Sequence, residues 1–216
     1  MFSGIVQSLG TVREIHRREG KARMIVETDR DFEGLELGES VAVNGVCLTV
    51  CQIMQNAFAV DMTAETLGRT SFKQTRPEAR VNLERALTPA QKVSGHFVAG
   101  HVDRTGVVVE IDRGAGETLF RFEHPPELAP YLVEKGSVAV DGISLTVFAC
   151  RDNRFSVSII PFTLEHTNLN ERKVGDHVNI ECDMIGKYVY KACENFLNRS
   201  DRPGIDTDFL KRHGFV

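Results

Sequence analysis

The chain has 216 residues, of which 42% are hydrophobic and 26% are charged, and its formal net charge is −4 at pH 7. These proportions are typical of a globular protein with one or two domains. The negative charge gives no general attraction to nucleic acid or to anionic membranes, and no apolar run approaches the length that spans a bilayer.

Two further features indicate the compartment. Residues 1–7 lack the basic stretch and the apolar core of a secretory signal. The chain has five cysteines, an odd number, and no Cys-x-x-Cys pair. The cysteines are Cys47, Cys51, Cys150, Cys182 and Cys193. This pattern predicts free thiols and a cytoplasmic protein.

The first half of the chain is predicted to consist mainly of strands. Val, Ile and Thr alternate with polar residues in short runs that glycines interrupt. The expected strands, in chain order, are residues 5–15, 22–27, 40–43, 46–53, 57–61 and 81–84. A short helix is expected over residues 31–35, and Pro89 in the polar segment 88–94 marks a boundary.

The second half shows the same kind of pattern. Its expected strands are residues 102–111, 119–122, 137–140, 143–148, 155–159 and 178–182, with a turn at 114–116 and a short helix at 126–133. Six short strands in about 90 residues are typical of a small closed barrel. The sequence therefore predicts a mainly β protein with one six-stranded barrel in each half.

The last part of the chain is predicted to be helical. Its apolar residues recur at positions i, i+3, i+4, i+7 and i+8, which predicts an amphipathic helix over 187–199; they are Val189, Ala192, Cys193, Phe196 and Leu197. Pro203 ends that pattern, and a second short helix is expected over 206–213. The helix has two possible partners, a barrel of its own chain or copies of itself in an oligomer.

The two halves repeat one another. Residues 43–50 return at 140–147, residues 66–70 at 163–167 and residues 81–84 at 178–181, each 97 positions later, and residues 4–7 return at 100–103. This period is longer than the roughly 20–50 residues of solenoid repeats and has the size of a small domain. We expect a duplicated domain with units at 1–93 and 94–186, a helical tail at 187–216, and a function that uses two similar sites.

The repeated strand has one aliphatic face and one small polar face. Cys47 and Thr49 share the polar face in the first copy, and Ser144 and Thr146 share it in the second. Such a face can hold a flat polar ring, although it is also typical of the wet side of an antiparallel sheet. Cys47 is a candidate nucleophile, or else a small buried apolar residue. Because Ser144 occupies the position of Cys47 in the second copy, the two half-sites are expected to have different chemical roles.

His96 and His101 are candidate metal ligands. Their spacing of five places them on opposite faces of a strand, and no Cys or His cluster has zinc spacing. The sequence therefore predicts no metal site. His101 remains either a proton carrier or a hydrogen-bonded surface histidine.

Four segments together resemble the riboflavin synthase alpha-chain family. They are residues 1–6, 44–50, 95–103 and 141–147, and the resemblance extends over the whole chain. It implies a homotrimer with two Greek-key barrels per chain and a trimerising C-terminal helix. It also implies a reaction without a metal or redox cofactor, in which two 6,7-dimethyl-8-ribityllumazine molecules give riboflavin and 5-amino-6-ribitylaminouracil. The active site would form between the N-terminal barrel of one subunit and the C-terminal barrel of another, and an association with lumazine synthase is possible.

The resemblance also implies the site residues. Those with chemical roles would be Cys47, His101, Ser144, Thr146 and Asp183. The first half-site and its surroundings would comprise Phe2 as a cap on the ring, Gly4, Ile5, Val6, Ser40, Cys47, Leu48, Thr49, Asp61, Met62, Thr63, Ala64, Glu65, Thr66, Gly100, His101 and Val102. The second would comprise Lys135, Asp141, Ser144, Leu145, Thr146, Ile159, Ile160, Pro161, Phe162, Thr163 and Leu164, where Phe162 stands in place of the polar residue of many relatives.

Two other functions compete with the enzyme. A related protein that binds lumazine or flavin as an optical antenna would have lost reactive residues in one half-site, but Cys47, His101 and Ser144 are all present. A flavin-dependent reductase would add a nucleotide-binding α/β half and an Arg-x-Tyr-Ser/Thr motif, and the sequence has neither. The enzyme is therefore preferred.

Overall fold

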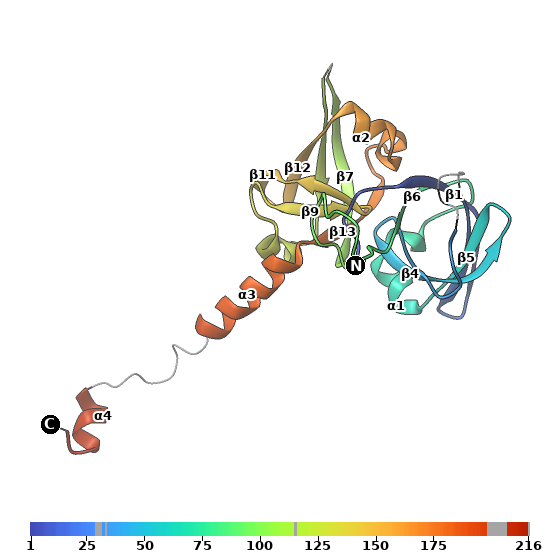
Figure 1. Cartoon of the computed structure of the whole chain (residues 1–216). Helices are drawn as coiled ribbons and strands as arrows, with labels where there is room; N and C mark the ends of the chain where they lie inside the picture. The colour runs from blue at the N-terminus through green and yellow to red at the C-terminus, as the bar shows by residue number, and fades with distance from the viewer. Residues whose placement is uncertain (29–31, 33, 115, 198–206, 216) are drawn as a thin grey trace.

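The structure is a computed structural model that describes residues 1–28, 32, 34–114, 116–197 and 207–215. Two β-barrels lie side by side, and a helix projects from the second (Figure 1). The first barrel is closed, with the strand order β1-β2-β5-β4-β3-β6. Its strands are β1 (Ser8–Arg18), β2 (Lys21–Thr28), β3 (Ser40–Val43), β4 (Val46–Met54), β5 (Ala57–Met62) and β6 (Arg80–Arg85).

The second barrel has seven strands, so the expectation of six is wrong by one. Its sheet order is β10-β9-β13-β7-β8-β12-β11. The strands are β7 (Arg104–Arg113), β8 (Thr118–Glu123), β9 (Ser137–Val140), β10 (Ile143–Thr146), β11 (Phe148–Arg151), β12 (Arg154–Ile159) and β13 (His177–Cys182). The two edges of this sheet, β10 and β11, are consecutive in the chain and are joined through Val147.

The extra strand arises from a break within one predicted strand. The backbone N–H of Val147 donates to Gly136 O at 2.9 Å, and Lys135 N–H donates to Val147 O at 2.8 Å. In the first copy Val50 makes the matching pair of bonds, yet β4 continues past it through a bulge. Ala149 has a φ of +49°, a value that interrupts regular strand geometry. The segment expected as one strand over 143–148 therefore becomes β10 and β11.

The predicted start of the first strand in each half is wrong as well. β1 begins at Ser8 rather than at residue 5, and β7 begins at Arg104 rather than at residue 102. Among the residues before these strands, Gly4 and Gly100 accept hydrogen bonds from the opposite barrel, and Val6 and Val102 pack on its core. Alternating apolar residues alone do not distinguish such contacts from strand pairing.

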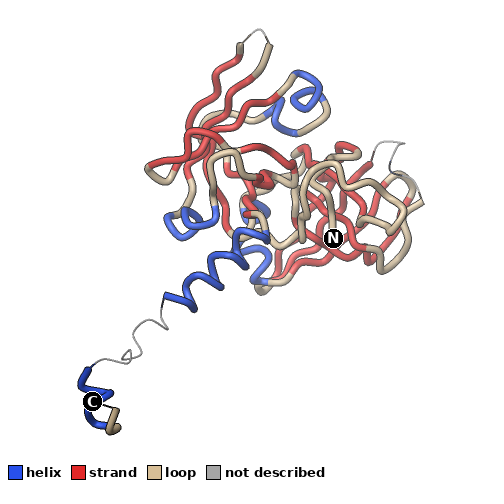
Figure 2. Tube along the Cα trace, turned by 60° about the vertical axis from the view of Figure 1, so that its left-hand side comes forward, coloured by secondary structure: helices blue, strands red, loops and turns tan. Residues whose placement is uncertain are grey.

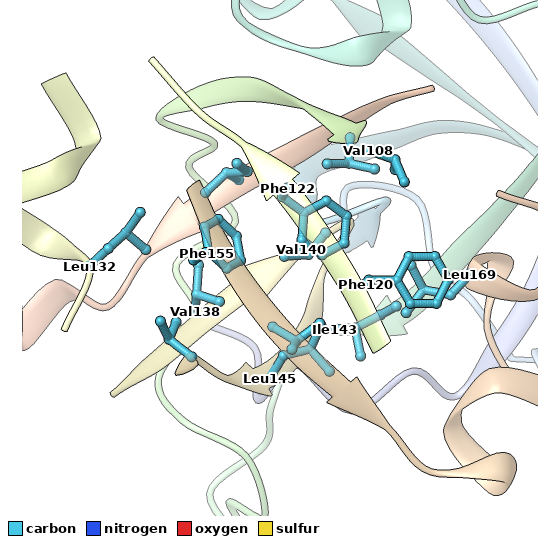
Figure 3. Close-up of a cluster of buried hydrophobic side chains, with 14 of the residues drawn as sticks. Val108, Phe120, Phe122, Leu132, Val138, Val140, Ile143, Leu145, Phe155 and Leu169 are labelled. Atoms are coloured by element: carbon cyan, nitrogen blue, oxygen red, sulfur yellow. The ribbon is translucent and has the colours of Figure 1, made fainter. Parts of the chain in front are cut away.

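Each barrel has its own apolar core. In the second, Phe120, Phe122, Phe155 and Leu169 are fully buried and pack together (Figure 3). The first core contains Phe58 among other fully buried side chains. Burial of each such side chain stabilises the fold by about 1.5–3 kcal/mol, so the core of each half can stabilise a barrel.

Several helical segments flank the barrels. The helix expected at 126–133 is confirmed as the 3-10 helix η3 (Pro126–Tyr131), whereas the helix expected at 31–35 is not tested, because residues 31 and 33 lie outside the described residues. Helices α1 (Ala64–Arg69) and α2 (Pro161–Glu165) were not predicted, because such short segments show no helical periodicity. Shorter 3-10 segments follow them at η2 (Ser71–Lys73) and η4 (Asn168–Glu171).

The tail contains α3 (Met184–Leu197) and α4 (Thr207–Arg212), which confirms both predicted helices apart from their ends. Helix α3 begins against η3, where the rings of Tyr131 and Tyr190 meet edge-on at 5.3 Å, and then projects away from both barrels (Figures 1 and 2). Tyr188 and Phe196 are 74% and 73% exposed. Most of its apolar face therefore does not pack on the barrels, contrary to one of the two expected arrangements. No helix in the described part of the chain is long and apolar enough to cross a membrane.

The barrels meet at a joint in which equivalent residues of the two copies contact one another. A Cβ added to Gly45 would lie 2.6 Å from the backbone nitrogen of Gly142, so the two turns touch through their backbones. Asn82 donates through its side chain to Asp141 O at 2.9 Å, and Asn179 donates in the same way to Asn44 O at 2.8 Å. The joint is thus a buried polar network with approximate two-fold symmetry.

Candidate functional site

The segment that precedes each barrel crosses to the other barrel. The backbone N–H of Ser144 donates to Gly4 O at 2.8 Å, and the N–H of Cys47 donates to Gly100 O at 2.8 Å. Between these contacts Phe2 and Val98 exchange backbone hydrogen bonds of 2.7 and 3.1 Å. Each half-site therefore combines the polar strand of one copy with the leading segment of the other.

Glycine is required where each segment crosses. Gly100 has a φ of +83°, and a Cβ there would lie 2.5 Å from the Cβ of Cys47. Gly4 has a φ of +75°, and a Cβ there would lie 2.7 Å from the Cβ of Ser144. Both positions need left-handed backbone and a side chain no larger than hydrogen. The backbone of the crossing segment consequently lies directly over the candidate reactive residue.

Two buried glutamates hold the crossing segments. Glu84 accepts hydrogen bonds from the backbone and hydroxyl of Ser3 at 2.6 and 2.7 Å and from Gly4 N–H at 3.0 Å. Glu181 accepts from Ala99 N–H at 2.6 Å and Gly100 N–H at 3.0 Å. Burial raises the pKa of each carboxyl group, and these hydrogen bonds oppose the rise. The sequence showed both glutamates within a repeated strand, but their position on that strand gave no indication of this role.

The first half-site opens into a cavity of about 580 Å³. Cys47 and His101 line it together with Val46, Glu65, Thr66, Arg69, Thr70, Gly100, Val102, Asp103, Arg104, Glu127, Leu128, Tyr131 and Lys187. Lys187 pairs with Asp103 at 2.7 Å, and Arg104 pairs with Glu127 at 2.8 Å. The structure thus brings Cys47 and His101 together in a charged cavity large enough for a small organic molecule.

The second half-site contains a residue that sequence reasoning did not assign. Ser144 Oγ and His96 Nδ1 share a hydrogen bond of 2.7 Å. Burial lowers the pKa of His96, and the negative charge of Asp183 opposes this effect. The neutral imidazole is therefore favoured, and it can take a proton from the serine hydroxyl. The sequence pattern suggests His96 only as a metal ligand on a strand, whereas the segment that carries it is not a strand.

Asp183 lies at the end of β13, where the chain enters α3. Its carboxylate accepts a hydrogen bond of 3.0 Å from Ile185 N–H and so caps the first turn of the helix. The same carboxylate acts electrostatically on His96. Ser144 and His96 are therefore joined by a hydrogen bond, whereas Asp183 acts on His96 through its charge.

Two residues predicted to contact the ligand, Phe2 and Asp141, are buried among protein side chains in the structure. Phe2 is fully buried and packs with Val98, Ala42 and Ala139 under the crossing segments, so its ring has no free face to cap a ligand. Asp141 is also fully buried and pairs with Arg172 at 2.5 Å in the joint between the barrels. In this structure both side chains make structural contacts, and the ligand roles expected for them stay predictions.

Most of the remaining predicted residues fall into two groups, while Val6, Ser40, Thr163 and Leu164 are half-buried. Four side chains point into the barrel cores and can offer only backbone atoms; they are Leu48, Met62, Leu145 and Ile159. The exposed group includes Thr49, Asp61, Thr63, Ala64, Lys135, Thr146, Ile160, Pro161 and Phe162. Within it, Asp61 pairs with Arg23 at 2.8 Å, and the ring of Phe162 stacks on His166 at 4.1 Å.

The described residues include no group of three or more His, Cys, Asp or Glu side chains arranged to hold a metal ion.

Comparison with known proteins gives a consistent result. A family model described as "Lumazine binding domain" matches residues 3–86 and 99–183. The chain is 42% identical over 219 residues to a riboflavin synthase of Actinobacillus pleuropneumoniae, and the match covers 100% of both chains. It is 37% identical over 215 residues to the riboflavin synthase of Bacillus subtilis, again over 100% of both, and 43% identical over 193 residues to that of Mycobacterium tuberculosis, over 88% of this chain and 96% of the other.

Solved structures of similar fold are also known. LumP complexed with riboflavin has a TM-score of 0.80 and 23% sequence identity, with 84% of this chain and 99% of that chain covered. LumP complexed with 6,7-dimethyl-8-(1'-D-ribityl) lumazine has a TM-score of 0.78 at the same identity and coverage. At this level of identity the likeness supports the fold.

Proposed function

The chain belongs to the riboflavin synthase family of lumazine-binding proteins, and we propose that it performs the reaction expected of that family. In this reaction one 6,7-dimethyl-8-ribityllumazine molecule gives a four-carbon unit to another. The products are riboflavin and 5-amino-6-ribitylaminouracil.

The observation that carries the proposal is the pair of related half-sites. Cys47 and Ser144 occupy equivalent strand positions, and each donates its backbone N–H to a crossing glycine carbonyl at 2.8 Å. A reaction between two identical molecules needs two similar binding sites. Fixing both partners in a reactive orientation supplies a large part of the rate acceleration.

The two half-sites of one chain do not share the first cavity. Neither Ser144 nor Thr146 is among the residues that line the cavity at Cys47. Stacking two rings face to face therefore favours an active site between the N-terminal barrel of one subunit and the C-terminal barrel of another.

The exposed apolar face of α3 supports the oligomer that this arrangement needs. Ile185, Tyr188, Val189 and Phe196 are each more than half exposed. An unpaired apolar helix face of this kind is typical of a subunit contact. We assign it to the centre of a homotrimer, in which α3 packs on its two copies.

The reactive groups divide between the half-sites. The 7-methyl group of the lumazine is acidic, because its anion delocalises into the ring system. In the first half-site, Cys47 is positioned to add to a ring and His101 to exchange protons. In the second, the Ser144–His96 pair exchanges protons, and Asp183 acts on His96. Thr49 and Thr146, both exposed on the polar strand faces, bind the rings or the ribityl chains.

Other predicted contacts belong to the same proposal. The backbone of 61–66 and of 159–164 would contact the ribityl chains or the rings of the bound lumazines. The exposed Lys135 and the half-buried Ser40 would lie at the rims of the two half-sites.

Incubation with 6,7-dimethyl-8-ribityllumazine tests the function directly. The expected result is a rise in flavin absorbance, with one riboflavin and one 5-amino-6-ribitylaminouracil formed for each two lumazines consumed. Binding of lumazine without conversion would instead identify an antenna protein.

Sedimentation of the native chain and of an Ile185→Glu/Val189→Glu variant tests the trimer. The native chain is expected to sediment as a trimer, and the variant is expected to sediment as a monomer.

Two further parts of the proposal concern the cell. All five cysteines, which lie within the described residues, are free, and this supports a cytoplasmic location. An association with lumazine synthase is the remaining partner that the family implies. Co-sedimentation of the two purified proteins tests it.

A further inference from the structure

A second polar cavity lies at the joint between the barrels. It has a volume of about 190 Å³ and shares no lining residue with the cavity at Cys47. The first copy contributes Asn44, Ser71, Gln74, Thr75, Arg76, Ala79, Arg80 and Val81, and the second contributes Arg172, Asp176 and His177. None of these residues belongs to the half-sites described above.

Two buried donors in this cavity have no hydrogen-bond partner among the described residues. One is the hydroxyl of Ser71, a residue that is only 8% exposed, and the other is Nε of Arg172. The other polar groups of Ser71 are used, because its N–H donates to Asn179 at 2.7 Å and its carbonyl accepts from Thr75 Oγ1 at 3.2 Å. A buried donor without a partner is energetically unfavourable, so two of them in one cavity indicate a ligand with acceptor atoms.

Three arginine side chains, which are hydrogen-bond donors, line the cavity. Arg76, Arg80 and Arg172 line it, against Asp176 as the one carboxylate among its lining residues. Arg172 also pairs with the buried Asp141 at 2.5 Å, and Asp176 accepts a hydrogen bond from Lys173 N–H at 2.9 Å. Glu171 also acts electrostatically on Arg172, so the preference for an anion comes from the donor groups of Ser71, Arg76 and Arg172 rather than from an excess of positive charge.

The cavity size limits the ligand. Sites for drug-sized molecules have volumes of about 300–1,000 Å³, so a cavity of 190 Å³ is too small for a flavin ring system. Arginine side chains bind phosphate oxygens through paired N–H groups, and hydroxyl donors commonly complete such sites. Donors that converge from two barrels suit a tetrahedral anion better than a planar one.

We propose that this cavity binds an oxyanion of the phosphate class, either free phosphate or the phosphoryl group of a small molecule. Ser71 and Arg172 would supply the inner donors, and Arg76 would hold the anion at the mouth. Because Arg172 also binds Asp141 in the joint, a bound anion would stabilise the contact between the two barrels. Ligands that bind the native state alone raise stability in proportion to the logarithm of their concentration.

The experiment uses the full chain and inorganic phosphate. Calorimetric titration is expected to show one phosphate per chain, and phosphate is expected to raise the melting temperature more than chloride at equal ionic strength. Ser71→Ala and Arg76→Gln should each weaken phosphate binding about tenfold, the usual effect of losing a hydrogen bond to a charged group. Since the Ser71 hydroxyl has no partner in the described structure, Ser71→Ala should fold normally without phosphate.

Arg151→Gln is the matched control, because Arg151 is exposed and lies away from the cavity lining. It removes the same charge and should leave phosphate affinity unchanged.

A parallel titration with ribose 5-phosphate identifies the source of the bound anion. Equal or tighter binding of ribose 5-phosphate indicates the phosphoryl group of a small molecule, and binding of inorganic phosphate alone indicates the free ion. The proposal is overturned if phosphate and chloride have the same effect, or if Ser71→Ala and Arg76→Gln bind phosphate as the native chain does. None of these readouts depends on lumazine turnover.

Discussion

The two half-sites share a backbone frame but differ in their reactive side chains. In each, a strand N–H donates to a crossing glycine carbonyl at 2.8 Å. The first places Cys47 beside His101 in an open cavity, whereas the second pairs Ser144 with the half-buried His96. Duplication has therefore kept the geometry that positions a ligand and changed the groups that act on it. This difference is what a reaction between one donor and one acceptor requires.

The joint between the barrels shows a second difference of this kind. Asn44 and Asp141 are equivalent and both are buried, but Asp141 carries a charge that Arg172 neutralises. The residue equivalent to Arg172 in the first copy is the uncharged Thr75. The ion pair thus makes one side of a nearly symmetric joint electrostatically distinct.

The largest expected effect comes from removing the two joint residues in turn. Asp141→Ala should lower the free energy of unfolding by about 3–5 kcal/mol, because Arg172 would be left as an uncompensated buried charge. Asn44→Ala removes hydrogen bonds to Asn82 N–H at 2.7 Å and to Asn168 at 3.1 Å, and should cost about 1–3 kcal/mol. Urea denaturation at fixed protein concentration measures both.

This pair is well matched, since Asn44 and Asp141 have φ values of +45° and +46° and alanine is equally strained at either position. Equal losses in the two variants would show that the ion pair adds nothing to the joint.

The next prediction concerns the reactive groups. Ser144→Ala should lower kcat by about 100-fold or more, because it removes the hydroxyl through which His96 exchanges protons. Cys47→Ala should give a smaller loss, since no described side chain holds the thiol by a hydrogen bond. Steady-state assays of riboflavin formation measure both values, and Gln52→Ala, at an exposed position of the same strand, serves as a control. Equal and negligible losses of kcat in the two variants would contradict the assignment of different chemical roles to Cys47 and Ser144.

The glutamates that hold the crossing segments should have smaller and similar effects. Glu84→Gln and Glu181→Gln each turn one acceptor oxygen into a donor that faces backbone N–H groups, and each should cost about 1–3 kcal/mol. Glu84→Gln should cost more, because Glu84 also accepts from the hydroxyl of Ser3 at 2.7 Å. Thermal unfolding measures the difference in stability between the two variants. In the Glu84→Gln/Ser3→Ala double variant the hydroxyl that causes this difference is absent. A larger loss in Glu181→Gln would contradict this ranking.

The smallest expected effect depends on pH. Burial lowers the pKa of His96 from its ordinary value of 6.5. As the pH falls below about 6.5, the unfolded chain therefore takes up a proton at this histidine before the folded chain does, and the fold loses stability. His96→Gln should lose less stability than the native chain between pH 7 and pH 5, because the other histidines contribute equally to both. A parallel decline in the two proteins would show that His96 is not held in its neutral form.

Local patterns in the sequence were enough to predict most of the fold. The duplication, the strands β3 and β9 and the helix α3 follow from repetition and periodicity, which depend on local burial. The break at Val147 could not be predicted in this way, because residues 147–150 form a continuous apolar run in which no alternation marks the end of one strand and the start of the next. Helices α1 and α2 were missed for the opposite reason, as both are too short to show a period.

The site was harder to predict than the fold. The polar faces at Cys47 and Ser144 were visible as strand alternation, but His96 was not, because its contact with Ser144 joins a loop to a distant strand. Asp141 and Phe2 resemble ligand contacts by their place in the motifs, yet both are fully buried in the structure. Long-range contacts made by irregular segments decide these cases, and a periodic pattern contains no information about them.

The most direct test of two unlike half-sites per chain is a binding titration with a ribityllumazine that lacks the 7-methyl group and so cannot react. We predict two ligands bound per chain, with Cys47→Trp removing one and Ser144→Trp removing the other. A single ligand per chain, lost in one variant and unaffected by the other, would contradict the account.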